Sequence, residues 1–294
     1  MRCFYVTVVA LALTSCGSDN GSAADGTGTA PITPVATPTP PPAPAPTPTP
    51  TPTPTSYRTS FDFQGDRVFD GVITASTTQT VPAHLAYGGL DSGTITFTAA
   101  NQALSAFGTT IVPGQMGATL ARTDANLIYT YMTATSGATL GIYRASSDAM
   151  YVSYLRQDEL VKPVQITRYA LVGAPTLAAD LPLTATSTYR VTVAQIGTSP
   201  TGQTLVVDGT NRRVTGSVSV ALTGKPIDVS VTFQGTLDAS TGRLDGVART
   251  SDGAYLGVFH GRLYGPSAVE VGLIFNLIDA DGNDLPGVLV GHSS

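Results

Sequence analysis

The chain has 294 residues, of which 42% are hydrophobic and only 12% are charged, and its formal net charge is −5 at pH 7. This charge, with no basic cluster beyond Arg212-Arg213, argues against a nucleic-acid partner and against electrostatic docking on anionic lipid. The 31 glycines, the 21 prolines and the lack of tryptophan are typical of an exported β protein with many turns.

The first residues predict export and lipid attachment. Arg2 is followed by an apolar run, Phe4 to Leu13, which has the pattern of a signal peptide and is too short to cross a hydrocarbon core of about 30 Å. The tetrad Leu13-Thr14-Ser15-Cys16 resembles the bacterial lipobox. This resemblance implies that residues 1–15 are a lipoprotein signal peptide and that Cys16 is lipidated, and Gly17 favours the outer membrane. The alternative is an ordinary signal peptide in which Cys16 is incidental.

Residues 16–56 predict a disordered linker. A stretch rich in glycine and serine comes first, and from Pro31 to Ser56 the chain is rich in proline and threonine. Because proline fixes φ and removes a backbone donor, an extended polyproline form is expected. Such a linker would be a semi-rigid stalk that holds the rest of the chain away from the lipid surface.

From Tyr57 onward the pattern predicts an all-β chain. No segment repeats its apolar residues with a period near 3.6, so little helix is expected. Prolines at Gly173-Ala174-Pro175 and Asp180-Leu181-Pro182 would each remove a ladder hydrogen bond, so the predicted boundary divides residues 57–172 from 173–294. Beyond Cys16 there is no cysteine, so no disulfide is expected. The expected strands of the first part are Gly93 to Ala99, Ala125 to Met132, Met150 to Leu155 and Val164 to Leu171.

The second part shows strict alternation. Apolar Ile227, Val229, Val231 and Phe233 alternate with polar residues, which places one row on a buried face and the other toward water. Several such runs separated by turn signals predict a barrel or a sandwich. The alternative is an integral outer-membrane barrel, in which the apolar rows would face lipid.

The closing hairpin, from Gly257 to Phe275, reads GVFHGRLYGPSAVEVGLIF. It resembles the closing signature of transferrin-binding protein B and its relatives, approximately G-x-F-x-G-x-[FL]-Y-G-P-x-A-x-E-x-G-G-x-F, although Leu273 stands where a second glycine is usual. A weaker match covers residues 173–189, where Leu183-Thr184-Ala185 departs from the family pattern.

This resemblance implies a β-rich handle-like domain over residues 57–172 and an eight-stranded antiparallel β-barrel over 173–294. In the family, the loops of the handle supply partner-binding residues. Those loops vary freely, so the ligand-binding residues of this chain stay unknown. The chain is about half as long as the two-lobed transferrin receptors of the family, and transferrin itself is therefore not the expected partner.

The remaining motifs favour structural interpretations. His84, His260 and His292 are too scattered for a metal site. The segment Asp279 to Asp284 has acidic groups at alternate positions, but it fails the calcium-loop pattern, so Asp281-Gly282 predicts a hairpin turn. A group of tyrosines either lines the core or presents rings to a partner or a haem-like solute. Its members are Tyr129, Tyr131, Tyr143, Tyr151 and Tyr154.

No catalytic pattern is present in the sequence. It contains no Gly-x-Ser-x-Gly elbow and no cysteine nucleophile. We therefore expect a non-enzymatic surface lipoprotein, without cofactor, metal or catalytic residues, that binds a protein or a small-molecule ligand. Iron or haem acquisition is one candidate role, and an outer-membrane transporter is one candidate partner. The alternatives are a structural envelope lipoprotein without a dedicated ligand and, as a weaker choice, a hydrolase.

Overall fold

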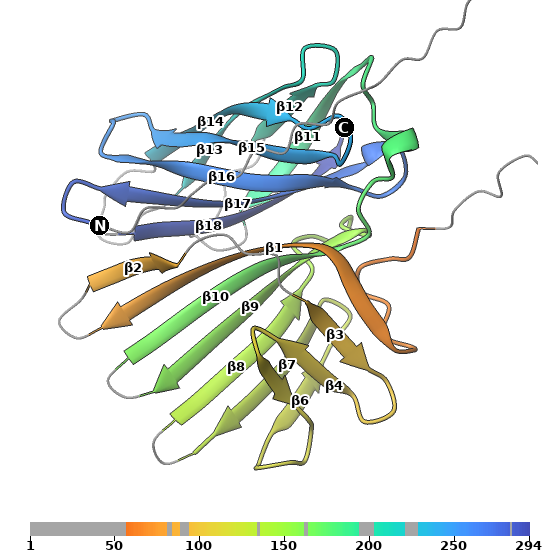
Figure 1. Cartoon of the computed structure of the whole chain (residues 1–294), viewed down its shortest axis with the longest axis vertical. Coiled ribbons are helices and arrows are strands. Elements are labelled where there is room, and N and C mark those ends of the chain that lie inside the picture. The colour runs from red at the N-terminus through yellow and green to blue at the C-terminus, as the bar shows by residue number, and fades with distance from the viewer. Residues whose placement is uncertain are drawn as a thin grey trace, which may run out of the picture. The chain divides into compact units, whose positions relative to one another are not determined.

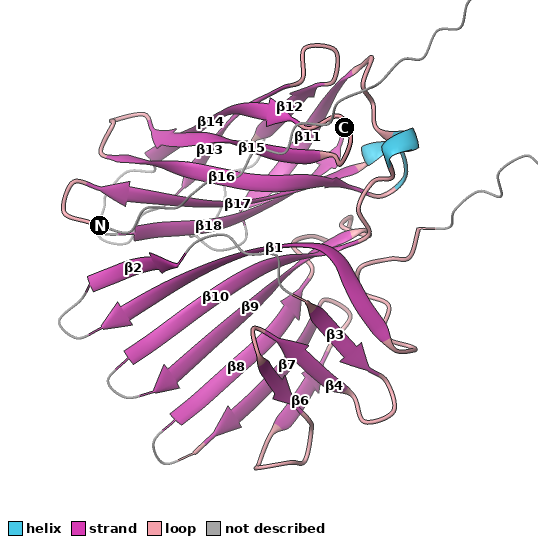
Figure 2. Ribbon diagram, viewed as in Figure 1, coloured by secondary structure: helices cyan, strands magenta, loops and turns pink. Residues whose placement is uncertain are grey.

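The structure is a computed structural model, and it describes residues 57–80, 84–88, 94–133, 136–161, 164–193, 203–220, 229–282 and 284–294. Outside these residues lie the expected signal peptide, Cys16, the linker over 16–56 and Ile227. The prediction of an all-β chain is confirmed. The described elements are strands, apart from two single turns of 3₁₀ helix, η1 (Ala178–Asp180) and η2 (Pro266–Ala268) (Figure 2).

The first strands form one sheet, called here the open sheet (Figure 1). Its order is β5-β4-β3-β1-β10-β9-β8-β7-β6, with β2 paired to β1. The strands are β1 (Arg67–Thr80), β2 (His84–Gly88), β3 (Ile95–Thr98), β4 (Ala103–Ala106), β5 (Thr109–Ile111), β6 (Thr119–Arg122), β7 (Asn126–Met132), β8 (Ser136–Tyr143), β9 (Val152–Val161) and β10 (Val164–Gly173). The four strands expected in this part correspond to β3, β7, β9 and β10.

The open sheet bends over a core of its own. The long strand β1 pairs with β3 through residues 67–69 and with β10 from Asp70 onward, and its register shifts between Asp70 and Ile73. This irregularity lets β3, β4 and β5 cover β7 to β10, because side chains from both groups share one buried cluster that includes Phe97, Leu104 and Leu140. Phe63 packs edge-on against Phe97, with 5.0 Å between ring centroids.

The second group of strands closes into an eight-stranded antiparallel barrel, as predicted from the resemblance. The strands are β11 (Thr186–Val193), β12 (Thr204–Asp208), β13 (Arg213–Val220), β14 (Val229–Leu237), β15 (Arg243–Thr250), β16 (Tyr255–Tyr264), β17 (Glu270–Asp279) and β18 (Asp284–Ser293). Val231 and Phe233 point into the barrel core, which is the direction expected for a barrel with a polar outer side. Strands β17 and β18 pair as an antiparallel hairpin, and between them Gly282 donates to the Asp279 carbonyl at 3.1 Å.

Three phenylalanine rings fill the middle of the barrel. Phe233 packs edge-on against Phe259 at 5.6 Å and against Phe275 at 5.3 Å between ring centroids, and all three are at most 1% exposed. The strands make room for these rings with glycines. A Cβ on Gly246 would collide with the Phe259 ring, and a Cβ on Gly287 with the Phe275 ring. The barrel is therefore a packed core and not a lumen.

The close fit around Phe275 predicts a large cost for any side chain at Gly287. We expect Gly287→Val to lower the free energy of unfolding by about 1–3 kcal/mol, because overpacking forces side chains and backbone to shift. The control is Thr236→Val on the exposed side of β14, which should change it by less than about 0.5 kcal/mol. Urea denaturation measures both variants, and equal effects would contradict the packing described here.

A buried carboxylate joins the open sheet to the barrel. Glu270, the first residue of β17, is fully buried. Its side chain accepts backbone N–H bonds from Met150 at 2.5 Å, from Tyr151 at 2.8 Å and from Val152 at 2.8 Å. Met150 and Tyr151 immediately precede β9 and Val152 begins it, so three successive amide dipoles converge on one carboxylate. Unpaired buried N–H groups are costly, and Glu270 is what satisfies these three.

An apolar cluster surrounds this contact. Val152 and Leu171 of the open sheet pack with Ile274, Val288 and Val290 on the outer side of the barrel. The connection is also backbone-bonded, since Gly265 donates to the Ala174 carbonyl at 2.8 Å. Gly265 has a φ of 75°, and a Cβ there would meet the Tyr151 ring, so glycine is required at this close approach.

Burial raises the pKa of Glu270 above its ordinary 4.5, although the three N–H donors oppose that shift. A raised pKa means that the folded state favours the protonated form. The stability from this group is then fully present below pH 4.5 and is lost as the pH rises through the raised pKa.

We therefore expect Glu270→Gln to be less stable than wild type by about 1–3 kcal/mol, because the amide NH₂ faces N–H groups that need acceptors. The difference should widen as the pH falls toward 4.5, since only the wild type titrates. Denaturation at several pH values tests this, with Asp148→Asn, at an exposed carboxylate, as control. A difference that narrows toward acid pH would contradict the assignment.

Candidate functional site

Strands β7 to β10 present a second face, opposite the core of the open sheet, and we call it the outer face. Its side chains lie in rows that cross the four strands in register. The rows are Met132, Gly137, Leu160 and Gln165; Thr130, Thr139, Asp158 and Thr167; Ile128, Gly141, Arg156 and Tyr169; Asn126, Tyr143, Tyr154 and Leu171. The last row reaches the barrel through Leu171, and the first lies farthest from it. The outer face thus makes apolar contact with the barrel at one end of the strands and presents a mixed polar surface at the other end.

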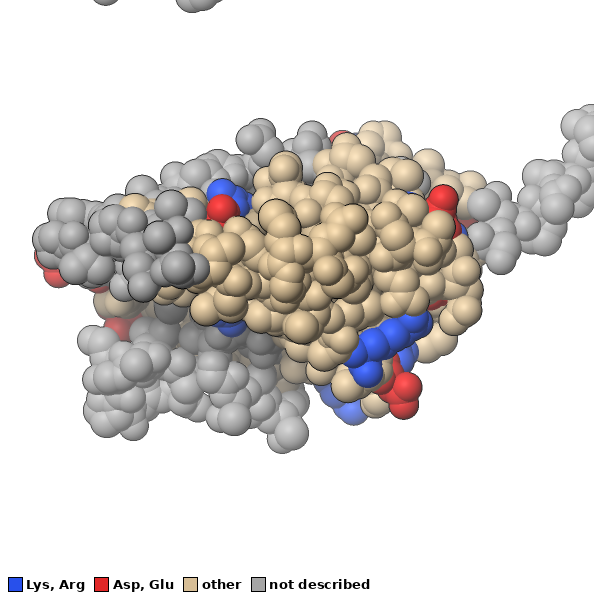
Figure 3. All heavy atoms as spheres, turned by 90° about the horizontal axis from the view of Figure 1, so that it is seen from below, with Lys and Arg blue, Asp and Glu red and all other residues tan. Residues whose placement is uncertain are grey.

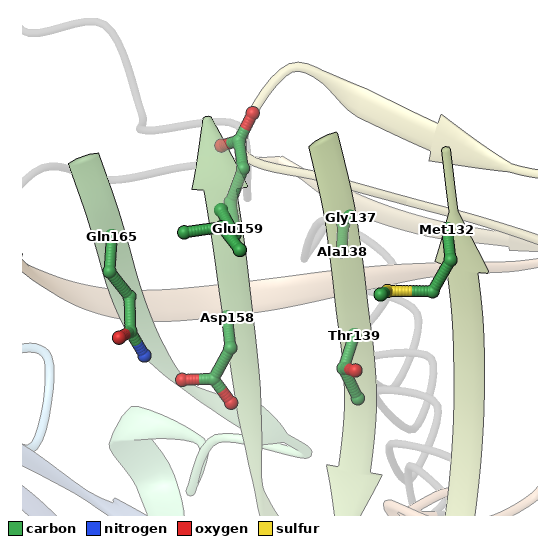
Figure 4. A pocket seen from close by; sticks show the side chains of 8 residues that line it. Met132, Gly137, Ala138, Thr139, Asp158, Glu159 and Gln165 are labelled. Atoms are coloured by element: carbon green, nitrogen blue, oxygen red, sulfur yellow. The ribbon is translucent and has the colours of Figure 1, made fainter. Parts of the chain in front are cut away.

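A shallow pocket occupies the far end of the outer face (Figure 4). It has a volume of about 150 Å³ and is lined by residues of β7 to β10. Asp158, Thr139 and Gln165 extend to one side of the sheet, and Glu159 extends to the other (Figure 4). Met132 is 68% exposed and Leu160 is 37% exposed. The Met132 sulfur lies where a side chain at Gly137 would be, so the pocket floor is apolar and adaptable.

A charged pair stands beside this pocket. The Arg156 guanidinium meets both carboxylate oxygens of Asp158, with Nε at 2.7 Å and an Nη at 2.9 Å, and the Thr167 hydroxyl donates to the same carboxylate at 2.9 Å. On the other side of the sheet, Arg168 pairs with Glu159 at 2.7 Å. The Nη contact is a charge-assisted hydrogen bond, and together with the Thr167 hydroxyl it holds the Asp158 carboxylate in place.

Two tyrosine rings continue the outer face toward the barrel. Tyr143 and Tyr154 form a cross-strand pair and stack with 5.1 Å between centroids and 17° between ring planes. The Tyr143 ring lies across Gly141, which leaves the ring flat on the sheet. Both tyrosines are half-buried, so one part of each ring packs and the other part is available for contact.

Burial keeps these phenols neutral. Burial raises the pKa of Tyr143 and of Tyr154, and it raises the pKa of Tyr169 to about 12. Burial by itself lowers the pKa of Arg156, but its hydrogen bond with Asp158 and the nearby tyrosines outweigh this, so the pKa is raised. At neutral pH the outer face therefore presents neutral hydroxyls around one fixed ion pair.

The five tyrosines singled out in the sequence do not form one group. Tyr129 is fully buried, and its hydroxyl donates to the Gln102 carbonyl at 2.7 Å. Tyr131 packs against the same core. Tyr151 meets Tyr57 edge-on at 6.1 Å beside the junction with the barrel. Only Tyr143 and Tyr154 lie together on the outer face.

The histidines are dispersed as well. His84 begins β2, and His292 lies near the end of β18, with Nδ1 at 2.8 Å from the Ser293 carbonyl. His260 is on the outside of the barrel, with Nδ1 at 2.5 Å from the Asp245 carboxylate. Among the described residues, no serine or threonine hydroxyl is bonded to His260, and no three His, Cys, Asp or Glu side chains are grouped for a metal ion. The described helices are also too short to cross a membrane.

Apart from Tyr143 and Tyr154, the residues of the outer face were missed by sequence reasoning. Tyr154, Arg156, Asp158 and Leu160 alternate with the buried side of β9, so a period of two was present in the sequence. That pattern does not say which side of a strand a second layer covers. Figure 3 shows the molecule from the lower side of Figure 1, where β6, β7 and β8 lie. Much of the described surface in this view carries neither a positive nor a negative side chain.

Comparisons with known proteins give structural similarity only. No family model and no curated protein matches the chain. A double mutant of transferrin-binding protein B from Haemophilus parasuis has a TM-score of 0.47 at 16% identity, over 75% of this chain and 44% of that one. Transferrin-binding protein B from Neisseria meningitidis has a TM-score of 0.43 at 13% identity, over 76% of this chain and 43% of that one. The resemblance predicted from the closing hairpin is found again here, and the chain spans less than half of either structure.

The raised pKa of Tyr169 predicts that the protein loses stability at alkaline pH. Its ordinary value is 10.0, so its contribution to stability is complete below pH 10 and is lost as the pH rises through about 12. We expect wild type to lose about 2–3 kcal/mol more than Tyr169→Phe between these limits. Denaturation at pH 9 to 12 measures this loss, and identical alkaline slopes in the two proteins would contradict the burial of this phenol.

Proposed function

We propose that this chain is a non-enzymatic surface lipoprotein that binds a partner protein with the outer face of its open sheet. In this proposal Cys16 carries the lipid that anchors it in the outer membrane, and residues 16–56 form the spacer. Residues 57–172 are the handle-like domain and residues 173–294 are the barrel domain. The resemblance of the closing hairpin supports this organisation.

The filled barrel is the observation that carries the proposal. Phe233, Phe259 and Phe275 occupy its centre, and glycines on neighbouring strands fit against their rings. A ligand could enter only by displacing this packed core, which is costly. The barrel therefore serves as a scaffold, and recognition falls to side chains outside it.

The size and chemistry of the outer face favour a protein over a solute. The pocket holds about 150 Å³, whereas sites for drug-sized ligands enclose roughly 300–1,000 Å³. A haem-like solute would exceed it. The face combines tyrosines, an arginine and exposed Met132, and these residue types are enriched where proteins meet proteins.

Charges placed on the outer face should weaken binding of the partner without unfolding the protein. The variant is Met132→Glu combined with Leu160→Glu. The matched control is Val247→Glu combined with Leu256→Glu, at barrel positions that are 50% and 63% exposed. Host fluids and envelope extracts are passed over the full chain, and retained proteins are identified and their affinities measured. We expect the outer-face variant to bind at least about tenfold more weakly, as for a residue at the centre of an interface.

Three results would count against the proposal. Retention of no partner by wild type would favour the structural envelope protein, and retention of haem alone would favour a solute carrier. An equal loss in both double variants would place recognition elsewhere. Separately, Cys16→Ser should move the protein from the membrane fraction to the soluble fraction, and an unacylated Cys16 in mass spectrometry would remove the anchor from the proposal.

A further inference from the structure

A second and larger cavity lies at the opposite end of the same strands. Its volume is about 390 Å³. It is lined by Arg122 at the end of β6, by the turn that follows, by Arg144 just after β8, and by Phe61 from the segment before β1. The pocket of the outer face is instead at the start of β8 and the end of β9. The two sites are therefore separate, and this one does not depend on the proposed partner protein.

Two guanidinium groups face this cavity without a carboxylate partner. Arg144 donates to the Ala149 carbonyl at 3.1 Å, and it has further contacts with the Asp124 carbonyl and the Met150 sulfur, both at 3.5 Å. All three acceptors are neutral. Arg122 lies over the Phe63 ring, with Cζ 5.9 Å from the centroid. Among the described ion pairs, neither arginine has a carboxylate, unlike Arg58, Arg156 and Arg168.

This arrangement stands out in a chain with few cations. The whole sequence has 15 lysines and arginines against 20 acidic residues, yet two arginines meet at one cavity. The lining contains one acidic side chain, Asp124, so its charge is positive by one unit. Thr59 and Thr123 add hydroxyls, while Phe61 and Met150 supply apolar wall.

We propose that this cavity binds a small organic oxyanion, a carboxylate or a phosphate, between Arg122 and Arg144. Guanidinium groups present paired N–H donors that match the oxygens of such anions. The donors of Arg144 that now contact neutral acceptors would turn to the anion. The carbon part of the ligand contacts Phe61 and Met150, and the volume admits a group the size of a substituted benzene ring.

Calorimetry on the full chain tests the site with four probes: inorganic phosphate, phenyl phosphate, acetate and benzoate. We expect phenyl phosphate to bind more tightly than inorganic phosphate, and benzoate more tightly than acetate, because only the aromatic probes contact Phe61. Comparison of phenyl phosphate with benzoate shows which oxyanion is preferred.

Arg122→Gln should weaken binding of the preferred aromatic probe by about tenfold or more, as expected for lost hydrogen bonds to a charged group. Asp124→Asn should strengthen it, since a like charge leaves the site. The matched control is Arg249→Gln on β15 of the barrel, which should leave the affinity unchanged. Thermal denaturation of each variant establishes that it is folded.

Several outcomes would overturn the proposal. The first is no heat of binding for any probe at millimolar concentration. The second is an equal loss in Arg122→Gln and Arg249→Gln, which would mean general attraction to charge. The third is an unchanged affinity in a folded Arg122→Gln variant.

Discussion

The contact between the open sheet and the barrel is built around one buried carboxylate. Glu270 accepts N–H bonds from three successive residues that lead into β9, and the strand that carries it continues into the barrel wall. The same contact therefore ties the residues that lead into β9 to the first residue of β17. Apolar residues from both parts close around it, which excludes water and gives each hydrogen bond its full weight. These contacts place the outer face and the cavity beside Arg122 relative to the barrel.

The barrel and the open sheet divide the physical tasks between them. The barrel has phenylalanines in its centre and glycines against them, so it is stable without room for a ligand. The open sheet covers only one of its faces with a core of its own. Its other face is used partly for the barrel and partly for solvent, and there the side chains form a tyrosine stack, a fixed Arg156–Asp158 pair and an apolar pocket floor. The surface that we propose for recognition is thus the part of the outer face that the barrel leaves uncovered.

Particular residues show how far sequence reasoning reached. The alternation around Val231 and Phe233 predicted an inward apolar row, and the structure has it. For the tyrosines, the sequence did not predict which side of the sheet each one would occupy. Tyr129 and Tyr143 stand in neighbouring strands, yet Tyr129 is in the core and Tyr143 is on the outer face. The difference arises because β3 to β5 cover one side of β7 to β10, and a contact between segments so distant leaves no local pattern.

The sequence by itself determined the fold class of this protein and the places where its strands are interrupted. Alternating residues with a period of two require strands and prolines interrupt them, because these are local consequences of backbone geometry. The barrel was implied by the resemblance of the closing hairpin, from Gly257 to Phe275. Only the tertiary structure decided which glycines pack against aromatic rings, that Glu270 joins the open sheet to the barrel, and that Arg122 and Arg144 share a cavity. Those features depend on distances between residues far apart in the chain, and such distances exist only after the strands have paired.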